Sequence, residues 1–145
     1  MKKKAMGLDL GTRSCGIAVS DALGIAHGYE EFRFQEGAYR QCLKHVIELL
    51  HQLGIDEVAL GYPLNMDGSA GERAQSAERF KSQLLDEDPN LKITLVDERL
   101  TTVMATNRLL EADISRKKRH AVIDKQAAIV ILQSYLDRKE FENAN

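Results

Sequence analysis

The sequence predicts an α/β fold in which helices flank a mixed five-stranded sheet, with three antiparallel strands first. One observation is that three strand-like segments near the start are joined by only a few residues, as antiparallel strands are. A second is that apolar residues change to helical spacing after residue 38. A third is that strand-like and helix-like segments alternate from there on, which is typical of a sheet covered by helices. With 145 residues, the chain is expected to form one domain, 1–145.

The first three strands are expected at about 5–10, 15–20 and 25–34. Residues 11–14 form the turn between the first two, so these strands should pair antiparallel. In the third segment two sets of side chains should face opposite ways, Tyr29, Glu31 and Arg33 against Glu30, Phe32 and Phe34.

After these strands the apolar residues of 39–53 lie at helical spacing, and Gly54 provides the stop. The remaining elements are expected in this order: a strand at 57–61, a helix at 72–85, a strand at 92–96, a short helix at 101–110 and a final helix at 121–138 followed by a frayed polar tail.

The composition, 43% hydrophobic and 29% charged residues, is that of an ordinary soluble globular protein. Cys15 and Cys42 lie in different elements without metal-ligand spacing, which argues against a zinc site or a disulfide scaffold and fits a reducing cytosol. No apolar run approaches the ~18 residues of a transmembrane helix, so we expect a cytoplasmic protein with no membrane partner. The lysines at 2–4 are interpreted as a solvated tail rather than a leader.

Asp9 is the lone charge in the apolar first strand. Its neighbours on the same face of the strand are Gly7 and Gly11, so no adjacent side chain screens the carboxylate. A ligand, a metal or a second backbone can therefore approach closely. An ionised carboxylate on a nearly buried strand is costly unless it is paired or bound to metal. The alternative is a strand-end aspartate satisfied by the amides of the turn.

Asp97 and Glu98 follow an apolar strand at its C-terminal end, where ligands bind in open α/β sheets. Because neighbouring residues of a strand face opposite ways, one of the two should enter the site and the other should face outward or cap the next helix. Asp124 lies on the same face of the expected final helix as Ala128, Ile131 and Tyr135, residues of the kind found in a protein core. Asp124 should therefore point towards the sheet, or alternatively complement the helix dipole.

Three carboxylates, Asp9, Glu98 and Asp124, would repel one another in one place unless hard cations neutralised them. Ligation by oxygen alone selects Mg²⁺ or Mn²⁺ over zinc. Two such ions ~3.5–4 Å apart can activate water and stabilise the leaving oxygen in phosphodiester hydrolysis. Basic residues could hold the phosphate backbone of a nucleic acid, with solvent exposure or simple salt bridges as the alternative. The candidates are Arg13, Arg73, Arg99, Arg116, Lys117, Lys118 and Arg119.

Ordered motifs at 7–12, 16–21, 61–68, 97–102 and 124–128 closely resemble the YqgF family, also called RuvX. The resemblance implies a ribonuclease H-like fold related to Holliday junction resolvases of the RuvC type. It also implies a nuclease that processes the 5′ end of the small-subunit ribosomal RNA precursor, with Asp9, Glu98 and Asp124 as the metal-binding acids. Related resolvases use four carboxylates, and Asp97 and Asp21 are the candidates for the fourth.

Other interpretations remain open at this level. The substrate could be branched DNA instead of precursor rRNA, and the protein could act as a monomer or a homodimer. A module that binds RNA or the ribosome without cleaving would share the fold. The strand and turn at 5–14 also resemble the phosphate loop of the actin and sugar-kinase superfamily, although the chain lacks a second such hairpin and is too short for two such domains.

Overall fold

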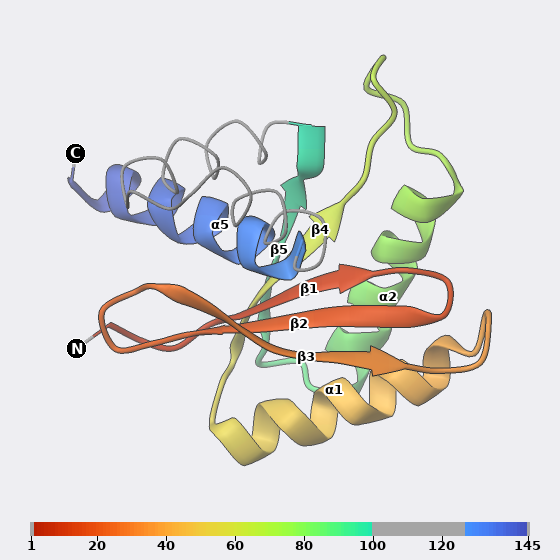
Figure 1. Ribbon diagram of the computed structural model, residues 1–145, viewed down its shortest axis with the longest axis horizontal. Coiled ribbons are helices and arrows are strands. Elements are labelled where there is room, and N and C mark those ends of the chain that lie inside the picture. Colours follow the sequence, from red (N-terminus) through yellow and green to blue (C-terminus); the bar gives the residue numbers. More distant parts are fainter. Residues whose placement is uncertain (1, 100–126, 145) are drawn as a thin grey trace, which may run out of the picture.

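The structure, a computed structural model, describes residues 2–99 and 127–144 (Figure 1). Within these ranges the chain forms a five-stranded mixed sheet in the order β3-β2-β1-β4-β5. The first three strands are antiparallel neighbours, whereas β4 pairs parallel with β1 and β5 pairs parallel with β4. This confirms the predicted mixed sheet. The strands are β1 Met6–Leu10, β2 Ser14–Ser20, β3 Ala26–Arg33, β4 Glu57–Tyr62 and β5 Lys92–Asp97.

Three helices are described: α1 Tyr39–Leu53, α2 Glu72–Glu87 and α5 Ala127–Ala144. Gly54 ends α1 as predicted, because its φ of 67° is left-handed and its amide returns to the last turn. The expected frayed tail after residue 138 is wrong, since α5 continues to Ala144 through good helix formers. The expected helix at 101–110 and the start of the final helix lie outside the described residues. None of the helices described here has the length and apolarity needed to cross a bilayer.

The sheet separates two apolar clusters, as its covering helices in Figure 1 suggest. Met6, Leu8 and Leu10 point to the face that α1 and α2 cover, where Val46 and Phe80 are buried. The opposite face packs against α5 through small strand residues and the predicted stripe. That stripe, Ala128, Ile131 and Tyr135, is buried, which confirms its orientation towards the sheet.

Gly7 allows α5 to approach the sheet closely. A Cβ atom on Gly7 would lie 2.6 Å from Cβ of Leu132 and 2.7 Å from the carbonyl oxygen of Ala128. Gly7, one of the two glycines beside Asp9, therefore allows the backbone of α5 to approach β1, which is one of the possibilities that the sequence left open.

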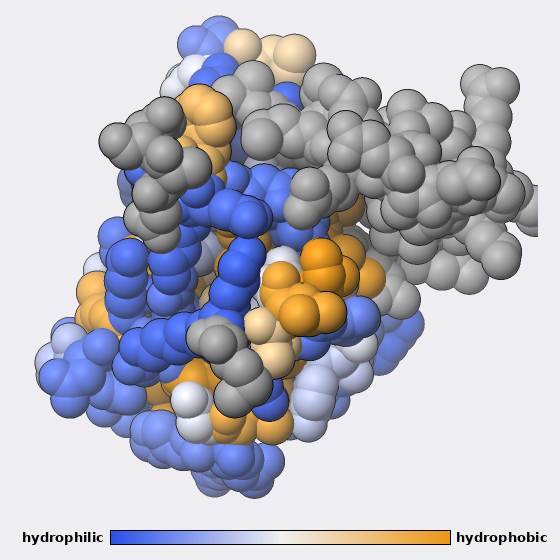
Figure 2. Space-filling view, turned by 90° about the vertical axis from the view of Figure 1, so that its left-hand side faces the viewer, coloured by the Kyte–Doolittle hydropathy of each residue, from blue (hydrophilic) through white to orange (hydrophobic). Residues whose placement is uncertain are grey.

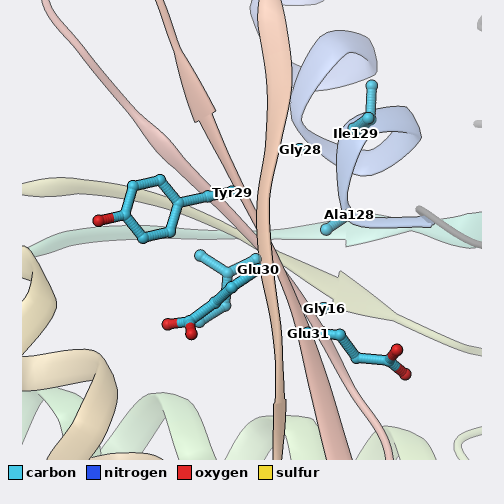
Figure 3. Close-up of a pocket in the computed structure, with 8 residues that line it drawn as sticks. Gly16, Gly28, Tyr29, Glu30, Glu31, Ala128 and Ile129 are labelled. Atoms are coloured by element: carbon cyan, nitrogen blue, oxygen red, sulfur yellow. The ribbon is translucent and has the colours of Figure 1, made fainter.

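A β-bulge changes the predicted alternation in β3. Ile17 pairs with Glu30, but Ala18 pairs with Gly28, so Tyr29 is an extra residue without a partner on β2. Tyr29 and Glu30 consequently project to the same side of the strand, and Glu31 projects to the other, as Figure 3 shows. The prediction that Tyr29 and Glu31 share a face is wrong for this reason.

Candidate functional site

Asp9 lies near the end of β1 in a row that crosses three strands. It pairs with Gly16 of β2, and Gly16 pairs with Glu31 of β3, so the three residues face the α5 side of the sheet. Its carboxyl group is 30% exposed. Because Gly16 has no side chain, the space beside the Asp9 carboxylate stays open on the β2 side. A Cβ atom there would touch Cβ of Asp9 at 3.7 Å.

Glu98 is the member of the 97–98 pair that reaches Asp9. Leu95 packs on the α1 and α2 side of the sheet and Val96 on the α5 side, so alternation sends Asp97 back to the first side and Glu98 to the second. A hydrogen bond links the Glu98 and Asp9 carboxyl groups. Gly61 makes room for this contact, because a Cβ atom at Gly61 would collide with Oε1 of Glu98.

The negative charge of the Asp9 and Glu98 carboxyl groups is not fully balanced by nearby positive charge. Burial and the negative charge of Asp9 together raise the pKa of Glu98 to about 7, although Arg73 opposes both effects. Burial also raises the pKa of Asp9, again against the influence of Arg73. The two carboxyl groups therefore share one proton as the pH approaches neutral.

Arg73 is the cation nearest to this pair within the described part of the chain. Its Nη2 atom lies 3.8 Å from Oδ1 of Asp9 and donates a hydrogen bond of 3.2 Å to the carbonyl oxygen of Leu10. Arg73 stands in the first turn of α2, where a positive charge opposes the helix dipole. Its contacts at the end of β1 account for this placement. The side chain is 54% exposed, so part of the guanidinium group faces solvent beside the acids.

Asp97 and Arg99 bind each other on the other side of the strand end. Nη2 of Arg99 lies 2.7 Å from Oδ2 of Asp97, and the backbone amide of Arg99 donates to Oδ1. The Arg99 guanidinium lowers the pKa of Asp97. The structure thus shows Asp97 paired with Arg99 rather than with Asp9. For Arg99 this is the simple salt bridge that the sequence analysis gave as the alternative to contact with a nucleic acid.

The remaining candidates are more dispersed. Arg13 lies exposed in the turn after β1, with no ion pair inside 2–99 or 127–144. Asp21 lies at the opposite end of β2 from the row of Asp9, where it accepts hydrogen bonds from the amides of Leu23 and Ile25 and contacts His27 at 2.7 Å. It therefore does not join the acid pair. Asp124 and the basic residues Arg116, Lys117, Lys118 and Arg119 lie outside the described residues.

Sequence reasoning missed Glu31. This carboxylate raises the pKa of Asp9, although its own closest cation is Arg33 at 3.8 Å. Glu31 borders a groove of about 290 Å³ between β3 and the start of α5, with Gly16, Gly28 and Ala128 on its other sides (Figure 3). Alternation along the third strand could have placed Glu31 on the correct face, but only the register across two strands puts it level with Asp9.

A divalent cation fits the chemistry of this pair. Asp9 and Glu98 offer only carboxylate oxygens, which Mg²⁺ and Mn²⁺ prefer. Their shared proton marks a place where positive charge is favourable, and a metal ion would displace it. Within the segments that the structure describes, no group of three acidic, histidine or cysteine side chains surrounds one point.

Comparison with known proteins places this chain in a family. The family model described as RuvX, Holliday junction resolvase, matches residues 3–138. A protein of Geobacillus sp. (strain WCH70) named “Putative pre-16S rRNA nuclease” is 46% identical over 138 residues, which is 94% of this chain and 99% of that protein. A protein of the same name from Bacillus subtilis (strain 168) is 43% identical over 135 residues, which is 92% of this chain and 97% of that protein.

The fold has solved counterparts as well. The structure titled T. thermophilus RuvC in complex with Holliday junction substrate has a TM-score of 0.62 and 17% identity, and the match covers 96% of each chain. This likeness shows a common ribonuclease H-like fold. Since the family model spans nearly the whole sequence and the relatives align almost end to end, the chain belongs to the RuvX family.

Proposed function

We propose that this protein is a metal-dependent nuclease that hydrolyses phosphodiester bonds at the 5′ end of pre-16S ribosomal RNA in the cytoplasm. The observation that carries the proposal is the Asp9 and Glu98 pair, which binds a proton near neutral pH and lies beside the half-exposed guanidinium of Arg73. Two carboxyl groups whose charge is not balanced favour a bound metal ion, and a cation beside them that faces solvent favours a phosphate diester held against that ion.

Asp9, Glu98 and Asp124 would hold Mg²⁺ or Mn²⁺, and a bound ion would supply Lewis acidity and a nucleophilic water. Asp9 pairs with Gly16 of β2, and the preceding residue Leu8 pairs with both β2 and β4, which keeps the carboxylate in place. Glu98 would hold the ion as a carboxylate, since a bound positive charge would lower its pKa. Arg73, held by the carbonyl of Leu10, donates to a non-bridging phosphate oxygen and orients the scissile group.

The choice of RNA rests on the relatives, whose printed name specifies pre-16S rRNA. A branched DNA junction is the second candidate, which the family description and the RuvC complex with its junction favour. In either case recognition should run through the phosphate backbone and shape of the nucleic acid. The chain has no tryptophan and only 6% aromatic residues, too few for a base-stacking surface.

The test compares wild type with Asp9→Asn in cleavage of precursor 16S rRNA and of a four-way DNA junction, each with Mg²⁺ or Mn²⁺. Asp9→Asn should abolish cleavage while the protein stays folded. Asp56→Asn is the matched control, because Asp56 is an exposed aspartate whose ion pair is with Lys3. Cleavage by Asp9→Asn at the wild-type rate would refute the assignment, and preferential cleavage of the junction would favour the second candidate.

A further inference from the structure

A second groove lies along β5, between this strand and one side of α5. It encloses about 260 Å³. The residues that line it are Lys92, Thr94, Leu95 and Val96 from β5 and Ser134, Tyr135, Arg138, Lys139 and Glu142 from α5. Lys92, Thr94 and Val96 share one face of the strand, and Leu95 borders the groove because β5 is the last strand of the described sheet. We call this feature the β5–α5 groove.

The charge of the β5–α5 groove is predominantly positive. Lys92, Arg138 and Lys139 contribute three cations, and Glu142 is the one acidic side chain among the described residues that line it. Lys92 and Arg138 form no ion pair with any residue of 2–99 or 127–144, and both are exposed. Lys92 lowers the pKa of Glu57 and Arg138 that of Asp97, but neither cation is within ion-pair distance of those acids, so both remain accessible to a polyanion.

The groove has a rigid wall. Glu57 is only 4% exposed at the start of β4, and Tyr135 donates a hydrogen bond of 2.6 Å to its carboxylate. The Lys139 ammonium lies 2.7 Å and 2.9 Å from the two oxygens of the same carboxylate. This buried cluster fixes the side of α5 against the sheet, so the cations of the groove stand on a fixed frame.

The groove and the candidate catalytic site share strand β5. Val96 lines it, and Glu98 follows two residues later at the end of the same strand. Arg138 is close enough to Asp97 to help lower the pKa of that carboxyl. Lys92, at the other end, is six residues from Glu98, which is about 20 Å along an extended strand. A nucleic acid strand carries several phosphates over that length.

Among the coloured residues of Figure 2 hydrophilic side chains predominate, and hydrophobic ones appear in several separate areas between them. The large hydrophobic side chains exposed within the described ranges, Leu23, Ile25, Tyr29, Met66 and Phe141, do not line the β5–α5 groove. Leu95, Val96 and Tyr135 give the groove an apolar floor, and the exposed Lys92 and Arg138 are the groups in it that can select an anionic ligand.

We propose that the β5–α5 groove binds the phosphodiester backbone of the nucleic acid strand that extends from the candidate catalytic site, through Lys92 and Arg138. This inference rests on the proposed nuclease function for its ligand. Lys139 shapes the groove, but its ammonium belongs to Glu57, so its substitution would disturb the fold as well as the surface.

The test uses the full chain in EDTA and a fluorescein-labelled single-stranded RNA that carries the 5′ cleavage region of the precursor. The double variant Lys92→Gln with Arg138→Gln is compared with Arg40→Gln with Lys44→Gln, which removes the same two charge types from exposed positions of α1 on the other face of the sheet. The groove variant should bind about tenfold more weakly, and the slope of log Kd against log salt should fall by about 1.4, at ~0.7 per lost contact. The α1 variant should bind like wild type.

Two readouts separate this proposal from the nuclease assignment. Hydrolysis of bis(p-nitrophenyl) phosphate with Mn²⁺ should be equal in wild type and the groove variant, because so small a diester does not reach the groove. Equal RNA affinity of the groove variant and wild type would overturn the groove proposal whatever the cleavage assays show. Equal weakening by the α1 variant would overturn it too, since the effect would then be one of net charge. Failure of every protein to cleave would refute the nuclease function and leave the binding comparison valid.

Discussion

Replacing Glu98 by glutamine should stabilise the metal-free protein above neutral pH and change little at pH 5. The pKa of Glu98 rises from its ordinary 4.5 to about 7 in the fold. Below about 4.5 the folded and unfolded chains both carry the proton, so there is no penalty. As the pH rises towards 7 the unfolded chain loses its proton first, and folding stability falls. Glutamine cannot ionise, so Glu98→Gln escapes this loss.

The size of the effect follows from the same shift. Each pKa unit corresponds to ~1.4 kcal/mol, so the difference between 4.5 and about 7 sets an upper limit of about 3 kcal/mol. Glu98 is only partly buried, and solvent reduces the penalty. We expect a gain of about 1–2 kcal/mol for Glu98→Gln at pH 8, which is a rise of several degrees in Tm for a chain of this size.

The assay is urea unfolding of wild type and Glu98→Gln in EDTA from pH 5 to pH 8. Glu48→Gln, an exposed glutamate on α1, is the matched control and should show no pH-dependent gain. Adding Mn²⁺ at pH 8 should stabilise wild type more than Glu98→Gln, because the ion replaces the proton in wild type. A stability difference between wild type and Glu98→Gln that stays constant from pH 5 to pH 8 would refute the reasoning.

Three further substitutions distinguish residues that stabilise the fold from a residue that shapes the candidate metal site. Gly7→Ala should cost about 1–3 kcal/mol in urea unfolding, because its Cβ would meet the α5 backbone at 2.7 Å, and unchanged stability would contradict the close approach. Gly61→Ala should instead weaken Mn²⁺ binding, measured by calorimetry, more than it lowers stability, since its Cβ meets the movable ends of Glu98 and Ile131. Tyr135→Phe should cost about 1–3 kcal/mol in thermal unfolding, because the buried Glu57 carboxylate loses a hydrogen-bond donor.

The elements whose signals are local were predictable from the sequence. Helix α1 spans the residues expected, because the apolar spacing and Gly54 act within a few residues of each other. The buried stripe of α5 was predictable for the same reason. The continuation of α5 to Ala144 was not expected, because the polar residues after 138 were interpreted as a tail although several of them are good helix formers.

Features that depend on register between strands were harder to predict. A one-residue shift sends a side chain to the other face of a sheet, and the bulge at Tyr29 does this without a glycine or proline at the bulged position to mark it. Glu31 was missed because its relation to Asp9 passes through two pairings. Alternation did predict that one of Asp97 and Glu98 would enter the site, but choosing between them required knowing which face Val96 takes.

Arg73 shows what a contact over long sequence separation adds. In the sequence it is an unfavourable cation in the first turn of a helix, and either a bound anion or solvent exposure explains it. In the structure its guanidinium bonds the carbonyl of Leu10, which lies 63 residues away, and stands 3.8 Å from Asp9. One side of Arg73 is thus used by the protein and the other faces solvent. The exposed side of Arg73 lies next to the Asp9 and Glu98 pair. A cation in the first turn lowers the stability of α2, but at this position its positive charge lies where a scissile phosphate would need it.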